Sequence, residues 1–496
     1  MKKIFTLMMV VLATIAARAT DYNEPIVVSV NGEASEQRGV ISVEEKDGLY
    51  DLTMKNFVLM SEDGATGVGN ISLKGIKSYK AGDATLLFAN DVVTITEGDD
   101  PNVIVWLAPM LPPVPVELSG KIENGHLRCF LNIDLMATLQ QQIKVTIGSG
   151  YQLSNQSLED WHTTTEAYVE PNAWHSFESA SGTLAPFAGH HIDKSADAHS
   201  GKASARLYST SIFGIIANGT MTTGRMNAGA FSATDPANHA FLDMSQSDVD
   251  GNGDPFYSPL YSRPDSIALW VKFKQGTANA AHPFATVSAV ITDGTFYQDP
   301  EDKEYSNVVA KAKYNTIAET SEWVRVVAPF NYVSETLAPK AVLVTVSTNA
   351  DAGQGSNGDE LLVDDIEFVY NAKMTGLKIK GQDVADFDPD KKEYAVEVSG
   401  EVTEADVEAQ LDSRAALVQK TIEAVENGYQ LTLKVLSGDM ATATVYVVNI
   451  KSTASGIKSM VSSTAKNNDC YNLNGQRVMQ PRKGLYIVGG KKVVMK

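Results

Sequence analysis

The stretch that decides the fold is ELLVDDIEFVY, residues 360–370. It predicts a β-strand, as do SIALWVKF at residues 266–273 and AVLVTVS at residues 341–347. The surrounding region, residues 150–370, is rich in short strands, aromatic residues, Gly, Ser and Asn, and it shows little helical periodicity. Several such strands over about 220 residues fit a jelly roll made of two β-sheets.

The N-terminal region predicts an antiparallel β-meander over residues 25–149. Alternating runs such as LYDLTM at 49–54 and QIKVTI at 142–147 are separated by turn signals. The turn signals are Asn31-Gly32, Asp47-Gly48, Asp63-Gly64 and Asn124-Gly125. A meander leaves unpaired edges unless it closes, so a small barrel is the simplest arrangement. The predicted barrel domain covers residues 20–149.

One run in this region carries a resemblance to a known family. The run VELSGKIENGHL at residues 116–127 resembles the calycin-like β-barrel domains of exported Gram-negative proteins. The resemblance implies a barrel of the kind that often holds an apolar ligand. The alternative is a filled barrel that acts as a spacer.

The central region, residues 150–370, resembles the family called the putative carbohydrate metabolism domain. The residues that carry the resemblance are LEDW at 158–161, WHSF at 174–177, GDPF at 253–256, Arg263-Pro264, LWVKF at 269–273 and VDDIE at 363–367. The resemblance implies a jelly roll akin to carbohydrate-binding modules and laminarinase-like folds.

Residues 371–452 predict a small β-sandwich. The region opens with MTGLKI at 374–379 and closes with TVYVVNI at 444–450. It resembles cadherin-like or immunoglobulin-like bacterial modules, which usually serve as spacers. The predicted fold class of the whole chain is therefore all-β: a calycin-like barrel, a jelly roll, an Ig-like sandwich and a short β tail.

The N-terminus reads as a secretory signal peptide over residues 1–19. Two lysines precede an apolar stretch at 4–17, and Ala17-Arg18-Ala19 fits the small-x-small cleavage pattern. The alternative is a membrane anchor, but a membrane span needs about 20 apolar residues. No other segment predicts a transmembrane span. The formal net charge of -19 argues against a nucleic-acid partner.

The C-terminal region, residues 453–496, is a Ser/Thr/Ala-rich linker followed by a basic tail. Its end, KGLYIVGGKKVV at 483–494, resembles the end of the C-terminal sorting domain of type IX secretion. The resemblance implies the export machinery as a partner; the alternative is a solvated basic hairpin. We expect a secreted or cell-surface protein associated with the outer membrane, with the periplasm as the alternative location.

Sugar binding requires aromatic faces that stack on C–H patches and polar groups that satisfy hydroxyls. In the central region, Trp174, Phe256, Tyr257 and Tyr261 lie in loop-like surroundings, with Arg263 nearby. These five residues are the predicted carbohydrate-binding set, although aromatics of this kind also cap the ends of sandwiches. Trp270 and Trp323 lie within strand patterns and are expected in the core.

Two groups of acidic residues suggest structural calcium. Asp248, Asp250, Asn252 and Asp254 place an oxygen ligand at every second residue of a Gly-containing loop. The twelfth position is Pro259 instead of Glu, so the loop is not an EF-hand. The alternative is an acidic surface turn.

The second group lies at the predicted first and last strands of the jelly roll, where acidic side chains of binding modules often meet around an ion. The matching positions are Glu159, Asp160, Asp364 and Asp365. Close carboxylates repel one another unless a cation or protons intervene.

Catalytic residues are not predicted. Glycosidases need two carboxyl groups about 5–9.5 Å apart, and the Glu-x-Asp-x-(x)-Glu strand of laminarinase-type jelly rolls is absent from residues 150–370. The sequence thus favours an exported protein that binds a polysaccharide or glycan through its central domain. The alternatives are a glycoside hydrolase with an unrecognised carboxylate pair and a structural or adhesive surface protein.

Overall fold

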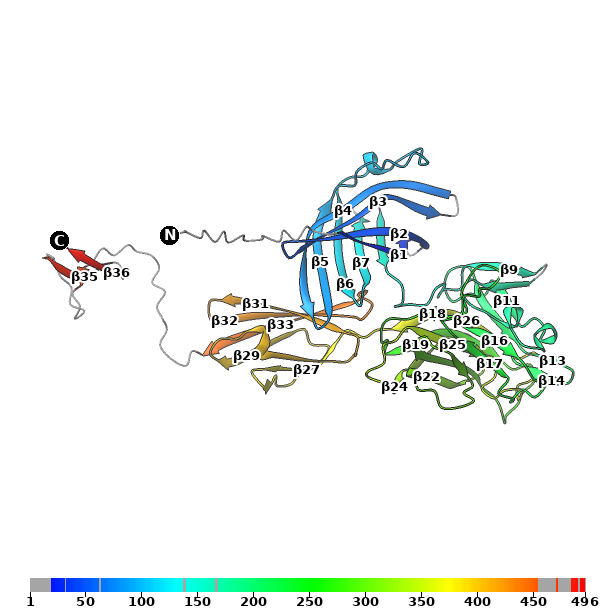
Figure 1. Cartoon of the computed structure of the whole chain (residues 1–496). Coiled ribbons are helices and arrows are strands. Elements are labelled where there is room, and N and C mark those ends of the chain that lie inside the picture. Colours follow the sequence, from blue (N-terminus) through cyan, green and yellow to red (C-terminus); the bar gives the residue numbers. More distant parts are fainter. Residues whose placement is uncertain are drawn as a thin grey trace, which may run out of the picture.

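A computed structural model describes residues 19–31, 33–61, 64–136, 140–165, 168–453, 470–471, 483–488 and 491–495. These residues form three successive β units, coloured blue to cyan, green, and yellow to orange in Figure 1. The all-β prediction is confirmed. The predicted signal peptide, apart from Ala19, and most of the predicted tail lie outside the described residues. Within these ranges, none of the helices has the length and apolar composition of a membrane span.

The first unit is a closed barrel in which eight antiparallel strands pair in sequence order and β1 pairs with β8. The strands are β1 (Ala19–Val30), β2 (Glu33–Lys46), β3 (Leu49–Ser61), β4 (Gly64–Ala81), β5 (Ala84–Val93), β6 (Val114–Glu123), β7 (His126–Leu135) and β8 (Gln141–Ile147), with η1 (Ala108–Met110) between β5 and β6. Alternate residues of every strand join one buried apolar cluster, which includes Ile26, Ile41, Leu52, Leu73, Leu118 and Val145. The predicted closed barrel is therefore confirmed.

The second unit contains two main antiparallel sheets. The five-stranded sheet has the order β11 (Ile192–Ser195), β12 (Ser204–Tyr208), β26 (Glu360–Val369), β19 (Ser266–Lys274), β23 (Thr320–Pro329). The six-stranded sheet has the order β15 (Thr220–Thr222), β25 (Ala341–Ser347), β20 (Ala285–Thr292), β22 (Val308–Ile317), β24 (Asn331–Tyr332), with β18 (Ser258–Pro259) also paired to β25. Apolar side chains of both sheets share one buried cluster, so the unit is a β-sandwich. Its finer assignment as a jelly roll stays a prediction.

Strand alternation explains which residues of β19 enter this core. Ile267, Leu269 and Phe273 are fully buried in the cluster. Trp270 points to the opposite face, where it is half-buried and stacks on His199 with ring centroids 3.8 Å apart. Trp323 on β23 is likewise half-buried outside the cluster. The prediction that both tryptophans lie in the core is wrong, because each takes the outward phase of its strand.

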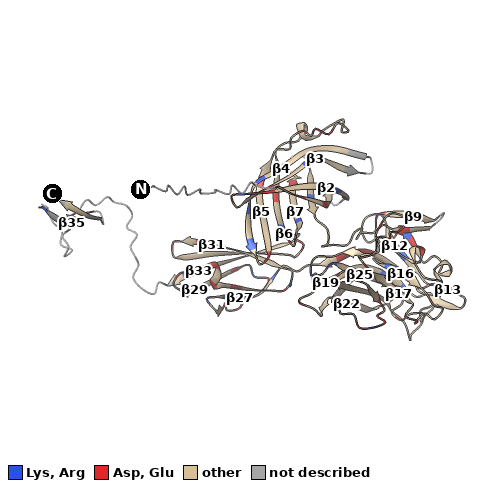
Figure 2. Ribbon diagram, in the orientation of Figure 1, with Lys and Arg blue, Asp and Glu red and all other residues tan. Residues whose placement is uncertain are grey.

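Smaller elements extend the sandwich. They are the hairpin β9 (Trp161–Thr165) and β10 (Tyr168–Pro171), the hairpin β13 (Thr210–Ile212) and β14 (Ile215–Ala217), the sheet of β16 (Arg225–Ala228), β17 (Asn238–Leu242) and β21 (Tyr297–Asp299), and the turns η2 (Phe177–Ser179) and η3 (Ala185–Phe187). Acidic and basic residues are interspersed in this unit (Figure 2), for example around β12, where Arg206 pairs with Asp193 and Glu360.

The third unit is a small β-sandwich with a shared apolar core. One sheet contains β28 (Gln382–Asp383), β27 (Met374–Ile379) and β30 (Val407–Leu411), and the other contains β29 (Glu393–Ser399), β33 (Ala443–Thr453), β32 (Gly428–Leu436) and β31 (Leu417–Val425), with η4 (Glu404–Asp406) before β30. The pair β29 and β33 is parallel. The Ig-like assignment stays a prediction. In the C-terminal part, β34 (Cys470–Tyr471), β35 (Gly484–Val488) and β36 (Lys491–Met495) form a separate sheet.

The barrel packs against the third unit, as Figure 1 shows for β5 above β31 and β33. Leu86 of the barrel joins Leu436 and Met440 in a buried cluster. The buried Arg128 donates from Nε to the carbonyl oxygen of Asp439 at 2.9 Å. The chain therefore buries a charged side chain and apolar surface between units that are far apart in sequence.

Candidate functional site

An open pocket of about 290 Å³ lies on the outer face of the six-stranded sheet. Val287 of β20 and Val344 and Val346 of β25 enter the sandwich core. The alternate positions on these strands, Ser288, Thr345 and Ser347, therefore point outward and line the pocket. The sheet β16–β17–β21 covers one part of the same face through apolar contacts. The uncovered part forms the pocket.

The floor of the pocket carries hydroxyl and amide side chains, with the charged side chains of Asp299 and Lys313 beside them. Thr220 and Ser347 share a hydrogen bond of 3.0 Å between their hydroxyl oxygens. The Ser288 hydroxyl donates to Asp299 Oδ2 at 2.6 Å. Asn218 donates from Nδ2 to the carbonyl oxygen of Asn349, while its Oδ1 is buried without a hydrogen-bond partner. The floor thus offers hydroxyl groups to the pocket, whereas the unpaired Asn218 Oδ1 is buried beneath its surface.

The rim of the pocket is aromatic and exposed. Phe213 is 75% exposed, Phe231 is 61% exposed, and Phe187 on η3 is also exposed. Phe213 lies at the tip of the β13–β14 hairpin with φ of 52°, followed by Gly214 with φ of 82°. Two-residue turns with positive φ at both positions favour Asn-Gly, and a bulky residue there is unusual. The hairpin therefore presents an apolar ring to solvent where a small polar residue is the common choice.

The predicted carbohydrate-binding residues lie elsewhere. Trp174 has no exposed surface and packs in the sandwich core, with its indole NH donating to the carbonyl oxygen of Ser154. Phe256 is buried between the ring of His175 and the guanidinium of Arg225. The prediction that these two rings form an exposed platform is wrong, because Trp174 packs in the sandwich core and His175 and Arg225 cover Phe256.

The other three predicted residues also contact protein groups. Tyr257 is half-buried against a small apolar cluster. Tyr261 stacks on His126 of the barrel, with centroids 4.2 Å apart. Arg263 donates to three backbone carbonyl oxygens, those of Ser334, Glu335 and Leu337. None of the five predicted residues is among the described residues that line the pocket.

The predicted calcium loop is held together by its own hydrogen bonds. Asp250 Oδ1 accepts the backbone N–H groups of Asn252 and Asp254 at 2.9 and 2.8 Å. Asp254 Oδ2 accepts the Asn252 side-chain amide and the N–H of Ala173. Asp248 turns away and pairs with Arg225. The four residues do not point toward one centre, and calcium binding by this loop stays a prediction.

Three residues of the second acidic group, Glu159, Asp364 and Asp365, contact the turn at residues 199–203, and calcium binding by this group stays a prediction. Glu159 Oε1 accepts the N–H groups of Lys202 and Ala203. Asp364 Oδ2 accepts the N–H of His199 at 2.7 Å, and Asp365 pairs with the His199 ring at 2.6 Å. Asp160 is exposed. Backbone N–H groups thus satisfy oxygens that the calcium prediction assigned to an ion.

Burial and the neighbouring charge of Asp365 raise the pKa of Asp364 to about 6. Hydrogen bonds from the backbone N–H groups of His199 and Ser200 oppose this shift but do not cancel it.

Residues 19–148 match the family model described as the calycin-like beta-barrel domain. No curated protein matches the chain. A crystal structure of a putative glycoside hydrolase from Bacteroides thetaiotaomicron is similar at 16% identity, with a TM-score of 0.34, over 52% of this chain and 87% of that chain. Another, of a putative glycoside hydrolase from Bacteroides vulgatus, is similar at 20% identity, with a TM-score of 0.31, over 42% of this chain and 89% of that chain. With identities and TM-scores this low, the two similarities carry no conclusion about function.

Proposed function

We propose that this chain is an exported carbohydrate-binding protein and that the pocket on the six-stranded sheet is its glycan site. The observation that carries the proposal is the combination of exposed rings, Phe213 and Phe231, with a floor of hydroxyl and amide side chains. Sugar rings have C–H faces edged by hydroxyl groups, which match an aromatic rim and a polar floor. The proposed function of the central unit is the one predicted from the sequence. Its proposed site is the pocket on the six-stranded sheet instead of the five predicted residues.

The hydroxyl groups of the floor suit the hydroxyl groups of a saccharide. Thr220, Ser288, Thr345 and Ser347 can each donate or accept a hydrogen bond. Small-ligand pockets occupy about 300–1,000 Å³, so a pocket of about 290 Å³ suits one or a few sugar units of a longer chain.

The pocket favours binding over hydrolysis. Asp299 is the only carboxylate among the described residues that line it, and its Oδ2 already accepts a hydrogen bond from Ser288. Most glycosidases use two carboxyl groups on opposite sides of the scissile bond. The rival function, a glycoside hydrolase, therefore lacks its second carboxyl group in this pocket.

The other parts of the chain have supporting roles in this proposal. The signal peptide and the tail that resembles a type IX sorting signal deliver the protein to the cell surface or beyond. The barrel and the third unit act as spacers for the glycan site. They pack on each other through the cluster of Leu86, Leu436 and Met440.

A glycan array probed with the full mature chain, followed by a reducing-sugar assay on every hit, tests the function. We expect binding to one class of glycan without release of reducing sugar. Release of sugar from a hit identifies a hydrolase. The absence of any glycan hit favours a structural or adhesive protein.

A further inference from the structure

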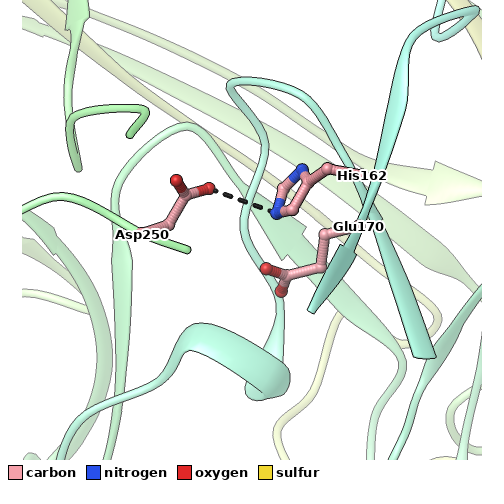
Figure 3. Close-up of side chains that lie close together, drawn as sticks. All are labelled: His162, Glu170 and Asp250. Atoms are coloured by element: carbon pink, nitrogen blue, oxygen red, sulfur yellow. Dashed lines mark ion pairs between the residues drawn. The ribbon is translucent and has the colours of Figure 1, made fainter. Parts of the chain in front are cut away.

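We propose that His162, Glu170 and Asp250, with His175 beside them, form a binding site for one zinc-like transition-metal ion. The four side chains come from three segments: the β9–β10 hairpin, the chain that follows it, and the loop after β17. Figure 3 shows His162, Glu170 and Asp250 pointing toward one another. This site is separate from the glycan pocket and does not depend on the proposed function.

Strand pairing positions two of the ligands. His162 on β9 and Glu170 on β10 are directly opposite residues in the antiparallel register, so their side chains lie on the same face of the hairpin. Asp250 reaches this face because the hydrogen bonds to its Oδ1 fix the loop and leave Oδ2 directed inward. The potential ligand atoms of these three residues all lie within 4.8 Å of one another.

The spacing fits atoms that share a metal better than atoms that share a proton. Asp250 Oδ2 lies 3.5 Å from His162 Nε2 and 3.5 Å from His175 Nε2. That separation is beyond the usual 2.7–3.2 Å range of an N–H···O hydrogen bond. Two ligands that each lie about 2.0–2.1 Å from a tetrahedral zinc ion are roughly 3.4 Å apart.

Burial leaves these atoms without any other partner. Glu170 and His175 are fully buried, and the side chain of Asp250 is 1% exposed. Glu170 Oε2, Asp250 Oδ2, His162 Nε2 and both ring nitrogens of His175 form no hydrogen bond. Unpaired buried polar groups are destabilising and rare, so a concentration of them around one point indicates a ligand.

The surrounding hydrogen bonds orient the ligands as supporting residues do in metal sites. His162 Nδ1 lies 3.0 Å from Asn172 Oδ1, and donation of its proton there leaves the lone pair of Nε2 free for a metal. Glu170 Oε1 accepts from the backbone N–H and hydroxyl of Ser176 and from the Ser179 hydroxyl, which leaves Oε2 for the ion.

The donor set selects the class of ion. Imidazole nitrogens are typical ligands of zinc and neighbouring transition metals, whereas calcium and magnesium prefer oxygen. Two carboxylates and two neutral imidazoles carry a charge that one divalent cation neutralises, which removes the main cost of burying the acids. Asp250, predicted as a calcium ligand, thus belongs to a site that the spacing of its own loop did not indicate.

The test uses the full mature chain without a histidine tag, stripped of metal with a chelator. Calorimetric titration with Zn²⁺ and elemental analysis are expected to give one ion per chain and an increase in melting temperature. His162→Gln removes a ligand at the more open edge of the site and is expected to weaken Zn²⁺ binding at least tenfold. Glu170→Gln removes a second proposed ligand, the Glu170 carboxylate. His282→Ala is the matched control, because His282 pairs with Asp351 at a more exposed position.

Zn²⁺ binding that is unchanged in His162→Gln and Glu170→Gln overturns the proposal, as does a wild-type chain that takes up no ion. Stabilisation by Ca²⁺ without stabilisation by Zn²⁺ also overturns it. If Glu170→Gln does not fold, His162→Gln, whose side chain is 9% exposed in wild type, decides the outcome.

Discussion

The rings of Phe213 and Phe231 meet edge to face, with their centroids 6.3 Å apart. They come from two separate loops, the tip of the β13–β14 hairpin and the connection between β16 and β17, and both are largely exposed. An exposed aromatic pair contributes little to the core, so its position over a polar floor is best explained by a ligand.

Replacing Phe213 with Asn separates stability from binding. Asn tolerates the positive φ of this position better than Phe, so Phe213→Asn should leave the free energy of unfolding unchanged or raise it by a fraction of 1 kcal/mol. The same change removes a stacking face and should weaken glycan binding about tenfold. Chemical denaturation and calorimetry measure the two effects. A parallel loss of stability and affinity contradicts the binding role of the ring.

Trp174→Ala should behave as a core substitution. The indole is fully buried in the main cluster of the sandwich, and truncation of a buried Trp costs about 3–5 kcal/mol. We expect a large fall in melting temperature, measured by circular dichroism. A stable variant with a specific loss of glycan binding contradicts the observed burial.

Asp364 should make the stability of the protein depend on pH. Its pKa is raised from 3.8 to about 6 in the folded state, so the folded protein binds more protons than the unfolded chain between these values. The stability present below pH 4 is therefore lost as the pH rises through about 6. Asp364→Asn should reduce this dependence. Unfolding curves from pH 4 to 7 in EGTA measure the free energy of unfolding of both proteins. The same pH dependence in wild type and Asp364→Asn contradicts the prediction.

Cys129 should be unreactive in the folded protein. Burial raises the pKa of its thiol to about 12, and the side chain has no exposed surface in the barrel core. In a Cys470→Ser background, a thiol reagent at pH 8 should label the native chain far more slowly than the chain in denaturant. Rapid native labelling indicates that the barrel opens readily.

Local sequence signals predicted the fold well where strand alternation and turns decide it. The Asn-Gly and Asp-Gly turns and the alternating runs gave the barrel, and the apolar period of residues 266–273 gave β19. The same rule predicted the strand that contains Trp270 but placed its side chain on the wrong face, because a strand pattern does not say which face a tryptophan occupies.

The candidate sites depend on contacts that no local pattern contains. Phe213 carried a weak signal, since an apolar residue before Gly in a short turn is unusual, but its partner Phe231 is brought near only by the fold. The metal candidate joins opposite residues of one hairpin, His162 and Glu170, to Asp250 from a distant loop. The spacing around Asp250 suggested calcium because it contained only oxygen ligands.

The most direct test of the glycan site is a calorimetric titration of the best array hit into three proteins: wild type, Phe213→Ala/Phe231→Ala, and Phe296→Ala. Phe296 is an exposed phenylalanine of the same unit that does not line the pocket. We predict that the double variant loses at least tenfold in affinity with an unchanged melting temperature, while Phe296→Ala binds like wild type. Equal affinity in all three proteins contradicts the assignment of the pocket.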